Sequence, residues 1–223
     1  MIRIVHLYPR ELGINGDVGN VLALRRRAEW RGVDVQVHDH EVGANLPPEA
    51  HVVHIGSGPV SGQRLVVDDL QRIAPTLRAW AAAGVPTLAI AGGWQLMGES
   101  LALETGELLP GAGVLPTSSR LTGRRVVGEV WSEGVAGFEN HGAVTVTTSG
   151  EPADWPVARF GASIATTLHG PFLPMNPRFA DELLGVAAQL AGVELGEPAP
   201  ELSDVDTAAE RSREAIRRRP HSR

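Results

Sequence analysis

Cysteine is absent from this 223-residue sequence. The absence excludes disulfide bonds, thiolate metal sites and a cysteine nucleophile. Histidine is left as a metal-ligand candidate, in His38-Asp-His40 and His51-Val-Val-His54. Residues two apart on a strand share a face, so His38 and His40 could hold one ion together. Two ligands without a third make a weak site, so we expect no metal and interpret these histidines as surface or hydrogen-bonded side chains.

Long apolar runs and an excess of positive charge are also missing. The longest apolar stretches, at 85–91 and 183–190, are too short or too polar to cross a bilayer. The first residues have a strand pattern instead of a basic segment followed by an apolar one, so we expect a cytoplasmic protein. A formal net charge of −6 disfavours general nucleic-acid binding. Because the chain has no P-loop lysine motif, we expect it to bind neither ATP nor another cofactor by itself.

Strand and helix patterns alternate over the first part of the chain. We expect strands near 2–8, 33–38, 50–55 and 85–91, and helices near 18–31, 68–83 and 92–101. Asp17 and Asn20 are candidate caps of the first helix. The alternation predicts an α/β fold with a doubly wound, mainly parallel sheet, in which ligands bind at the carboxyl ends of the strands. The glycine-rich turns at 56–62 and 92–93 fall at those ends.

The second half changes character. Glycine, valine and threonine dominate after residue 110, with strand patterns at 124–130, 143–148 and 164–168. An amphipathic helix is expected over 178–191, then a linker rich in Gly, Pro and Glu over 192–200. A charged helix over 201–219 carries few large apolar residues. We therefore expect one domain over 1–191 and a helical tail over 201–223 that packs lightly or docks on a partner.

The segment from Thr87 to Gly98, Thr-Leu-Ala-Ile-Ala-Gly-Gly-Trp-Gln-Leu-Met-Gly, has the layout of a nucleophile elbow. An apolar strand breaks into a glycine pair and becomes helical. Such a turn exposes one side chain above the sheet and lets N–H groups at the helix start hold an oxyanion. The residue at the tip is Ala91, whose methyl group cannot attack a substrate. The sequence thus predicts the elbow and oxyanion-binding turn of a nucleophilic enzyme without its nucleophile.

Four ordered blocks resemble a known family: Gly16-Asp-Val-Gly-Asn20, Ile90-Ala-Gly-Gly-Trp-Gln-Leu-Met-Gly98, Gly137-Phe-Glu-Asn-His-Gly142 and Leu168-His-Gly-Pro-Phe-Leu-Pro-Met-Asn-Pro177. The chain resembles the class I glutamine amidotransferases of the cobyric acid synthase type, and in particular the amidotransferase subunits of two-protein lipid II isoglutaminyl synthases. The resemblance implies a flavodoxin-like fold and hydrolysis of L-glutamine by a cysteine thiolate. It also implies transfer of the ammonia to a Mur-ligase-like, ATP-dependent partner subunit that amidates peptidoglycan, or to the synthesis of a corrin amide.

Carried over position by position, the resemblance puts the nucleophile at Ala91 and the general base at His169. It implies an oxyanion and substrate site built from two glycine turns, one residue of the elbow helix and one arginine: Gly56, Gly58, Gly92, Gly93, Gln95 and Arg125. The third-strand loop departs from the family pattern. Pro59 there lacks a backbone donor, and Val60 stands where an acid is usual.

These departures favour a pseudo-amidotransferase, which keeps the fold and acts as a binding or regulatory subunit beside a ligase. Two alternatives stay open. In the first, Ala91 is an engineered replacement of cysteine in an active amidotransferase. In the second, the scaffold carries a different chemistry, with a new nucleophile or base supplied by Ser57, Ser61, His54 or His141.

Structural roles are also open to several of these residues. Without a thiol partner, His169 is better explained as a structural histidine, and Arg125 fits a surface strand. The segment 139–141 is expected to stabilise a turn beside the pocket. Trp94 could fill volume that a substrate would otherwise use.

Overall fold

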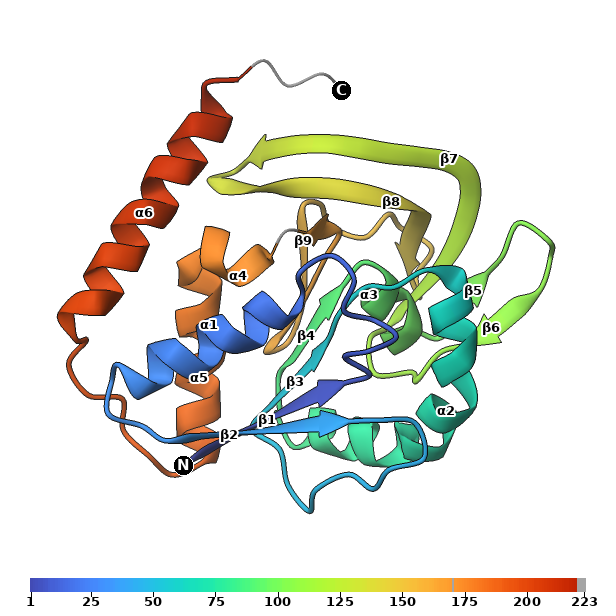
Figure 1. Ribbon diagram of the computed structural model, residues 1–223. Helices are drawn as coiled ribbons and strands as arrows, with labels where there is room; N and C mark the ends of the chain where they lie inside the picture. Colours follow the sequence, from blue (N-terminus) through green and yellow to red (C-terminus); the bar gives the residue numbers. More distant parts are fainter. Residues whose placement is uncertain (170, 220–223) are drawn as a thin grey trace.

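A computed structural model of the chain describes residues 1–169 and 171–219, which form two sheets (Figure 1). The six-stranded sheet has the order β2-β1-β3-β4-β10-β9. Its first five strands run parallel: β2 (Val35–His40), β1 (Ile2–Leu7), β3 (Val52–Ile55), β4 (Thr87–Ile90) and β10 (Ser163–Thr166). The edge strand β9 (Val157–Phe160) is antiparallel.

Helices cover both faces of this sheet. One face packs against α1 (Val18–Glu29) and α5 (Pro177–Leu190), and the other against α2 (Val60–Ala82) and α3 (Gly92–Met97). Side chains alternate between the two faces along each strand. Ile4 packs in the core on the α1 and α5 face, and Val5 packs in the core on the α2 and α3 face. The predicted doubly wound, mainly parallel α/β fold is confirmed.

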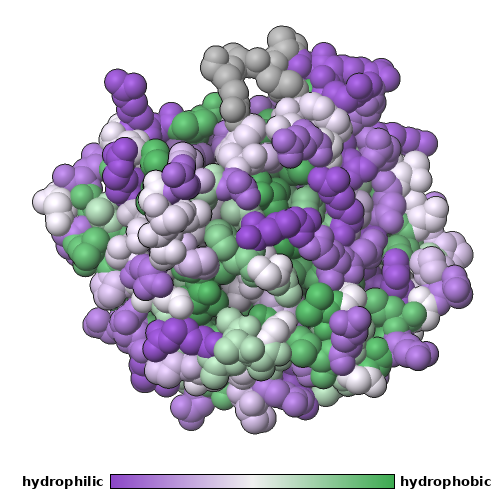
Figure 2. All heavy atoms as spheres, turned by 180° about the vertical axis from the view of Figure 1, so that it is seen from behind, coloured by the Kyte–Doolittle hydropathy of each residue, from purple (hydrophilic) through white to green (hydrophobic). Residues whose placement is uncertain are grey.

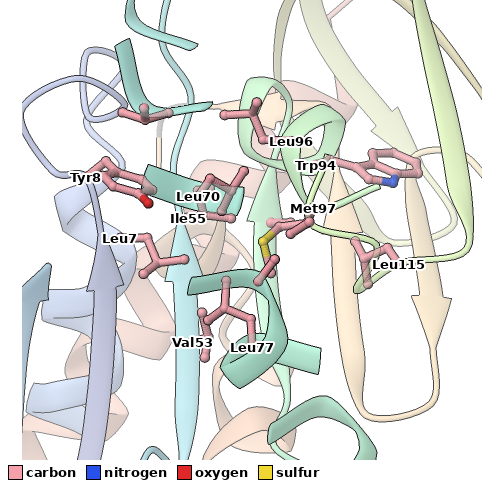
Figure 3. Packing of buried hydrophobic residues seen from close by; sticks show 14 of the residues in the cluster. Leu7, Tyr8, Val53, Ile55, Leu70, Leu77, Trp94, Leu96, Met97 and Leu115 are labelled. Carbon is pink, nitrogen blue, oxygen red and sulfur yellow. The ribbon is translucent and has the colours of Figure 1, made fainter. Parts of the chain in front are cut away.

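The core on the α2 and α3 face holds the elbow helix α3 in place. Figure 3 shows Trp94, Leu96 and Met97 of α3 among buried side chains of α2 and β3. The Trp94 indole donates to the Thr117 hydroxyl at 3.2 Å. The expectation that Trp94 fills substrate volume is therefore wrong, because its ring lies in the core.

The second sheet has the order β11-β8-β7-β5-β6. Its strands are β5 (Ser100–Ala102), β6 (Leu108–Pro110), β7 (Thr117–Ser132), β8 (Val135–Thr147) and β11 (Leu168–His169). β7 and β8 form a long hairpin that arches over the carboxyl ends of the parallel strands (Figure 1). The strands expected at 124–130 and 143–148 are parts of this hairpin, and the segment 139–141 lies within β8, not in a turn.

Two helix boundaries also differ from the prediction. The helix expected from residue 68 begins at Val60, directly after Pro59, so the glycine loop before it is short. The helix expected over 92–101 ends at Met97, because the chain becomes extended at Gly98 and enters β5. A short helix α4 (Phe172–Met175) precedes α5.

The tail forms α6 (Pro200–Arg217), and residues 220–223 of the predicted tail lie outside the described residues. Only Leu202, Ala209 and Ile216 of this helix are buried. Figure 2 shows hydrophilic and apolar side chains interspersed on the back of the molecule. Across the described ranges, no helix combines the length and apolarity that a membrane span requires. The division into domain, linker and tail stays a prediction.

Candidate functional site

Ala91 sits at a strained turn between β4 and α3. Its φ of 43° and ψ of −100° lie in a region that side-chain-bearing residues rarely adopt, at a cost of about 1–3 kcal/mol. Two hydrogen bonds hold this backbone: the Ala91 N–H donates to the Thr166 carbonyl at 2.8 Å, and the Ala91 carbonyl accepts from the Gln95 N–H at 3.0 Å. The turn therefore has the geometry of a nucleophile elbow with a methyl group at its tip.

The glycine pair after Ala91 lets α3 press onto the loop that follows β3. A Cβ atom on Gly93 would lie 2.5 Å from the carbonyl oxygens of Ile55 and Gly56, and one on Gly92 would lie 2.7 Å from the Gln63 amide nitrogen. The backbone oxygens beside Gly93 cannot move aside, so no side chain fits there, whereas a side chain on Gly92 would require Gln63 to shift. The close approach brings the N–H groups of the elbow beside the loop, as an oxyanion site requires.

Ser57 lies beside the N–H groups of the elbow. Its hydroxyl accepts the Gly92 N–H at 3.3 Å, and its own N–H donates to the Asp17 carboxylate at 2.8 Å. Ser57 is only 6% exposed. One oxyanion donor predicted from the sequence is therefore already engaged by a side chain of the same protein.

The motif at the start of α1 braces the two loops of the site. Asp17 binds the β3 loop through Ser57, and Asn20 accepts the Leu173 N–H of α4 at 2.8 Å. Neither side chain caps α1, so that prediction is wrong; both are fully buried and reach across to other elements. Burial raises the pKa of Asp17 to about 6, although the hydrogen bond from Ser57 opposes the rise.

A cavity of about 240 Å³ opens beside the elbow. Five predicted site positions are among its lining: Gly58, Ala91, Gly92, Gln95 and Arg125. The others, Gly56, Gly93 and His169, are not among the described residues that line it. The volume lies below the roughly 300–1,000 Å³ of drug-sized pockets, so it suits a ligand no larger than a single amino acid.

Gln63 also lines the cavity, a role that was not predicted from the sequence. Its amide nitrogen donates to the Gln95 side-chain oxygen at 3.1 Å, and its own oxygen is buried without a partner among the described residues. The signal available was a polar residue in an otherwise apolar helix stripe with Val66, Val67 and Leu70. Such a residue is explained by a polar cavity above it.

Arg125 lies at the rim of the cavity, on the exposed part of β7. Its Nε donates to the Asn140 side-chain oxygen at 2.6 Å, and a second nitrogen donates to the Asn140 carbonyl at 3.4 Å. The guanidinium is thus held in place on the strand while remaining in contact with solvent. A carboxylate entering the cavity would meet this charge first.

His169 lies on β11, opposite Phe138 of β8, and is 4% exposed. Burial, helped by the nearby His141, lowers its pKa to about 4, so the imidazole is neutral at neutral pH. A neutral imidazole is the form that accepts a proton. The tip of the elbow offers no proton to accept, because its side chain is the methyl group of Ala91.

The hairpin is fixed above the site by Glu139. Its carboxylate accepts hydrogen bonds from His141 at 3.1 Å, Trp155 at 2.7 Å and Thr167 at 3.0 Å. Burial alone would raise the pKa of Glu139, but these hydrogen bonds lower it. His141 therefore lines the cavity as part of a structural network.

Two further histidine candidates, His54 and His40, have structural roles. His54 is fully buried between the carbonyl oxygens of Leu88 and Asp17, and burial lowers its pKa to about 3. His40 is buried against the Asp69 carboxylate at 2.8 Å. Over residues 1–169 and 171–219 no group of three or more His, Asp or Glu side chains is arranged to hold a metal ion.

Comparison with known proteins agrees with these features. A family model described as the CobB/CobQ-like glutamine amidotransferase domain matches residues 3–177. Subunit GatD of the lipid II isoglutaminyl synthase (glutamine-hydrolyzing) of Staphylococcus aureus (strain N315) is 30% identical, over 94% of this chain and 91% of that protein. The subunit of the same name from Streptococcus pneumoniae (strain ATCC BAA-255 / R6) is 27% identical, over 83% and 80%. A crystal structure of a glutamine amidotransferase matches with a TM-score of 0.52 at 17% identity, over 82% of this chain and 98% of that one, which supports the fold.

Proposed function

We propose that this chain, which belongs to the CobB/CobQ-like glutamine amidotransferase family, acts as a subunit that does not hydrolyse glutamine and works beside a Mur-ligase-like, ATP-dependent partner. The family membership confirms the predicted resemblance. The relatives named above are subunits of a glutamine-hydrolysing lipid II isoglutaminyl synthase. By analogy, we place this chain in the amidation of a peptidoglycan stem peptide.

One observation carries the proposal: the elbow keeps its strained backbone while its tip carries a methyl group. Hydrolysis of the glutamine amide needs a nucleophile there, and the loss of a catalytic nucleophile normally costs several orders of magnitude in rate. Ser57 adds a second obstacle, because its hydroxyl accepts the Gly92 N–H that an oxyanion would need. The elbow and the fold around it are retained, and we expect them to serve binding or regulation of the ligase.

The main alternative is an active amidotransferase whose cysteine was replaced by Ala91. Restoring a cysteine at position 91 distinguishes the proposed inactive subunit from this active amidotransferase. We would compare the unchanged protein, Ala91→Cys, Ala91→Cys/Ser57→Ala and Ala91→Cys/Ser61→Ala by titration calorimetry with L-glutamine and by ammonia release. Ser61 is exposed in the first turn of α2, so its change is a matched control for Ser57.

We expect no ammonia release by Ala91→Cys, and a gain only when the Ser57 hydroxyl is removed as well. Rapid hydrolysis by Ala91→Cys alone would establish the active alternative. Equal behaviour of the Ser57 and Ser61 double variants would contradict the obstructing role of Ser57.

A different chemistry on this scaffold has less support. The Ser57 hydroxyl faces a backbone N–H and not an imidazole, and His54 is sealed in the core. A serine nucleophile needs a base within hydrogen-bond reach. Ser57→Ala leaving any measured activity unchanged would remove this alternative.

A further inference from the structure

The second half of β7 has an unpaired backbone edge. β7 pairs with the parallel strand β5 only at 118–120, and over 126–132 its pairing in the described part of the chain is with β8 alone. Figure 1 shows this half of β7 on the outside of the hairpin, with β8 beneath it. An open strand edge presents N–H and C=O groups that can extend a sheet by another strand.

This edge also carries exposed apolar side chains. Val126 is 48% exposed and Val127 is 60% exposed, on opposite faces of the strand. Phe138, beside Glu129 on β8, is 40% exposed on the same face as Val127. Adjacent exposed valines on an open strand edge indicate a contact surface.

The sequence of the edge is complementary to itself. In Arg125-Val-Val-Gly-Glu129 the arginine and the glutamate lie two residues before and after Val127. Glu129 is on the face of Val127 in the regular ladder. Arg125 precedes that ladder, and its guanidinium reaches the same face, where it bonds Asn140, the β8 residue opposite Val127. When two such strands pair antiparallel about a two-fold axis at Val127, Val127 meets its copy and each Arg125 lies opposite a Glu129. Cross-strand pairs of opposite charge contribute about 0.2–1 kcal/mol each.

The axis is restricted to this position. Side chains paired across a sheet must lie on one face, so the axis can move only from one residue to the next and never to a point between two. With the axis at Val126, Arg125 would face Val127; with the axis at Gly128, Glu129 would face Val127. Neither pairs opposite charges.

We propose that β7 is the interface of a homodimer, in which the two β7 edges pair antiparallel at Val127 and join the hairpins into one continuous sheet. Within one chain, Glu129 also binds Arg219, which follows the end of α6, and Arg125 binds Asn140 of β8. Both charges therefore have partners within one chain, which they exchange for each other when the two edges pair. A single pair of strand edges falls below the roughly 1,200 Å² of stable interfaces, so we expect a dimer that dissociates on dilution.

Sedimentation velocity over a concentration series tests the proposal. We expect the unchanged protein to dimerise with rising concentration. Val127→Lys, which puts two like charges on the axis, should be monomeric, while Val144→Lys, at an exposed valine of β8, should dimerise normally. Arg125→Glu and Glu129→Arg should each weaken the dimer, and Arg125→Glu/Glu129→Arg should restore it.

Arg219→Ala separates the edge from the tail helix, because it removes the bond to Glu129 without changing β7. It should leave dimerisation intact. A protein that is monomeric at every concentration would overturn the proposal. So would a dimer that survives Val127→Lys, or a charge reversal that is not rescued by the double variant.

Discussion

The Asp17 carboxylate accepts a hydrogen bond from the Ser57 backbone N–H at 2.8 Å, and the Ser57 hydroxyl in turn accepts one from the N–H of Gly92 at the elbow. The start of α1 is thereby connected to the elbow through a single serine. A carboxylate in this position is costly, because Asp17 is fully buried and one of its oxygens has no partner among the described residues. The site is thus fixed by a buried acid that binds the lining residue Ser57 and is not itself among the described residues lining the cavity.

The first prediction concerns the pH dependence of Asp17. Burial raises its pKa from 3.8 to about 6, so the folded chain binds this proton more tightly than the unfolded chain. The resulting stabilisation is complete below pH 3.8 and is lost as the pH rises through 6, with a total of about 3 kcal/mol. Asp17→Asn, which keeps an acceptor for Ser57 and carries no charge, should gain stability relative to the unchanged protein across this window.

Urea unfolding at a series of pH values measures this difference. Asp17→Ala is the control, because it loses the acceptor and should be less stable at every pH. Parallel pH curves for the unchanged protein and Asp17→Asn would show that Asp17 has the same pKa in the folded and the unfolded chain.

The second prediction concerns strain at Ala91. Ala→Gly normally costs about 0.5–1 kcal/mol in a helix, because glycine has more freedom in the unfolded chain. At Ala91 glycine would also relieve the positive φ of 43°. Ala91→Gly should therefore be as stable as the unchanged protein or more so, while Ala79→Gly, on the exposed side of α2, should lose about 0.5–1 kcal/mol. Equal losses in thermal unfolding would refute the strain.

The third prediction concerns the approach of α3 to β3. A methyl group on Gly93 would meet two backbone oxygens at 2.5 Å, and backbone cannot move aside as a side chain can. Gly93→Ala should destabilise the protein by about 1–3 kcal/mol. Gly185→Ala, in α5 with no atom within 4 Å of the new methyl group, should gain up to about 1 kcal/mol. Denaturant midpoints compare the two, and a tolerated Gly93→Ala would mean that the elbow is loosely held.

The fourth prediction concerns the attachment of α6. Arg27 of α1 is 3% exposed and bonds Asp206 of α6 at 2.5 Å and Asp181 of α5 at 2.6 Å. Asp206→Ala should leave Arg27 paired with Asp181, cost about 1 kcal/mol and loosen the helix. Limited proteolysis within 192–200 should become faster, whereas Asp204→Ala, an exposed neighbour, should not change it. Equal cleavage of both variants would show that the apolar contacts of α6 hold it alone.

Local features of the chain were predictable. The elbow, its glycine pair and the alanine at its tip could be predicted from a dozen consecutive residues, because a strand-to-helix turn depends on local backbone chemistry. The alternation of strand and helix predicted the parallel sheet for the same reason. The absence of a cysteine thiol is evident from the sequence alone.

Long-range contacts decided the rest. Asp17 and Asn20 looked like helix caps from their position, but their partners are 40 and 153 residues away along the chain. The same holds for Ser57 over Gly92 and for Gln63 against Gln95, which only the packing of α3 on the β3 loop brings together. The chemical groups that the site has and lacks can be identified from the residues of the chain alone. Which of these groups meet depends on the tertiary structure, because hydrogen bonds between distant elements require the packing of the whole sheet and leave no periodic signal in the chain.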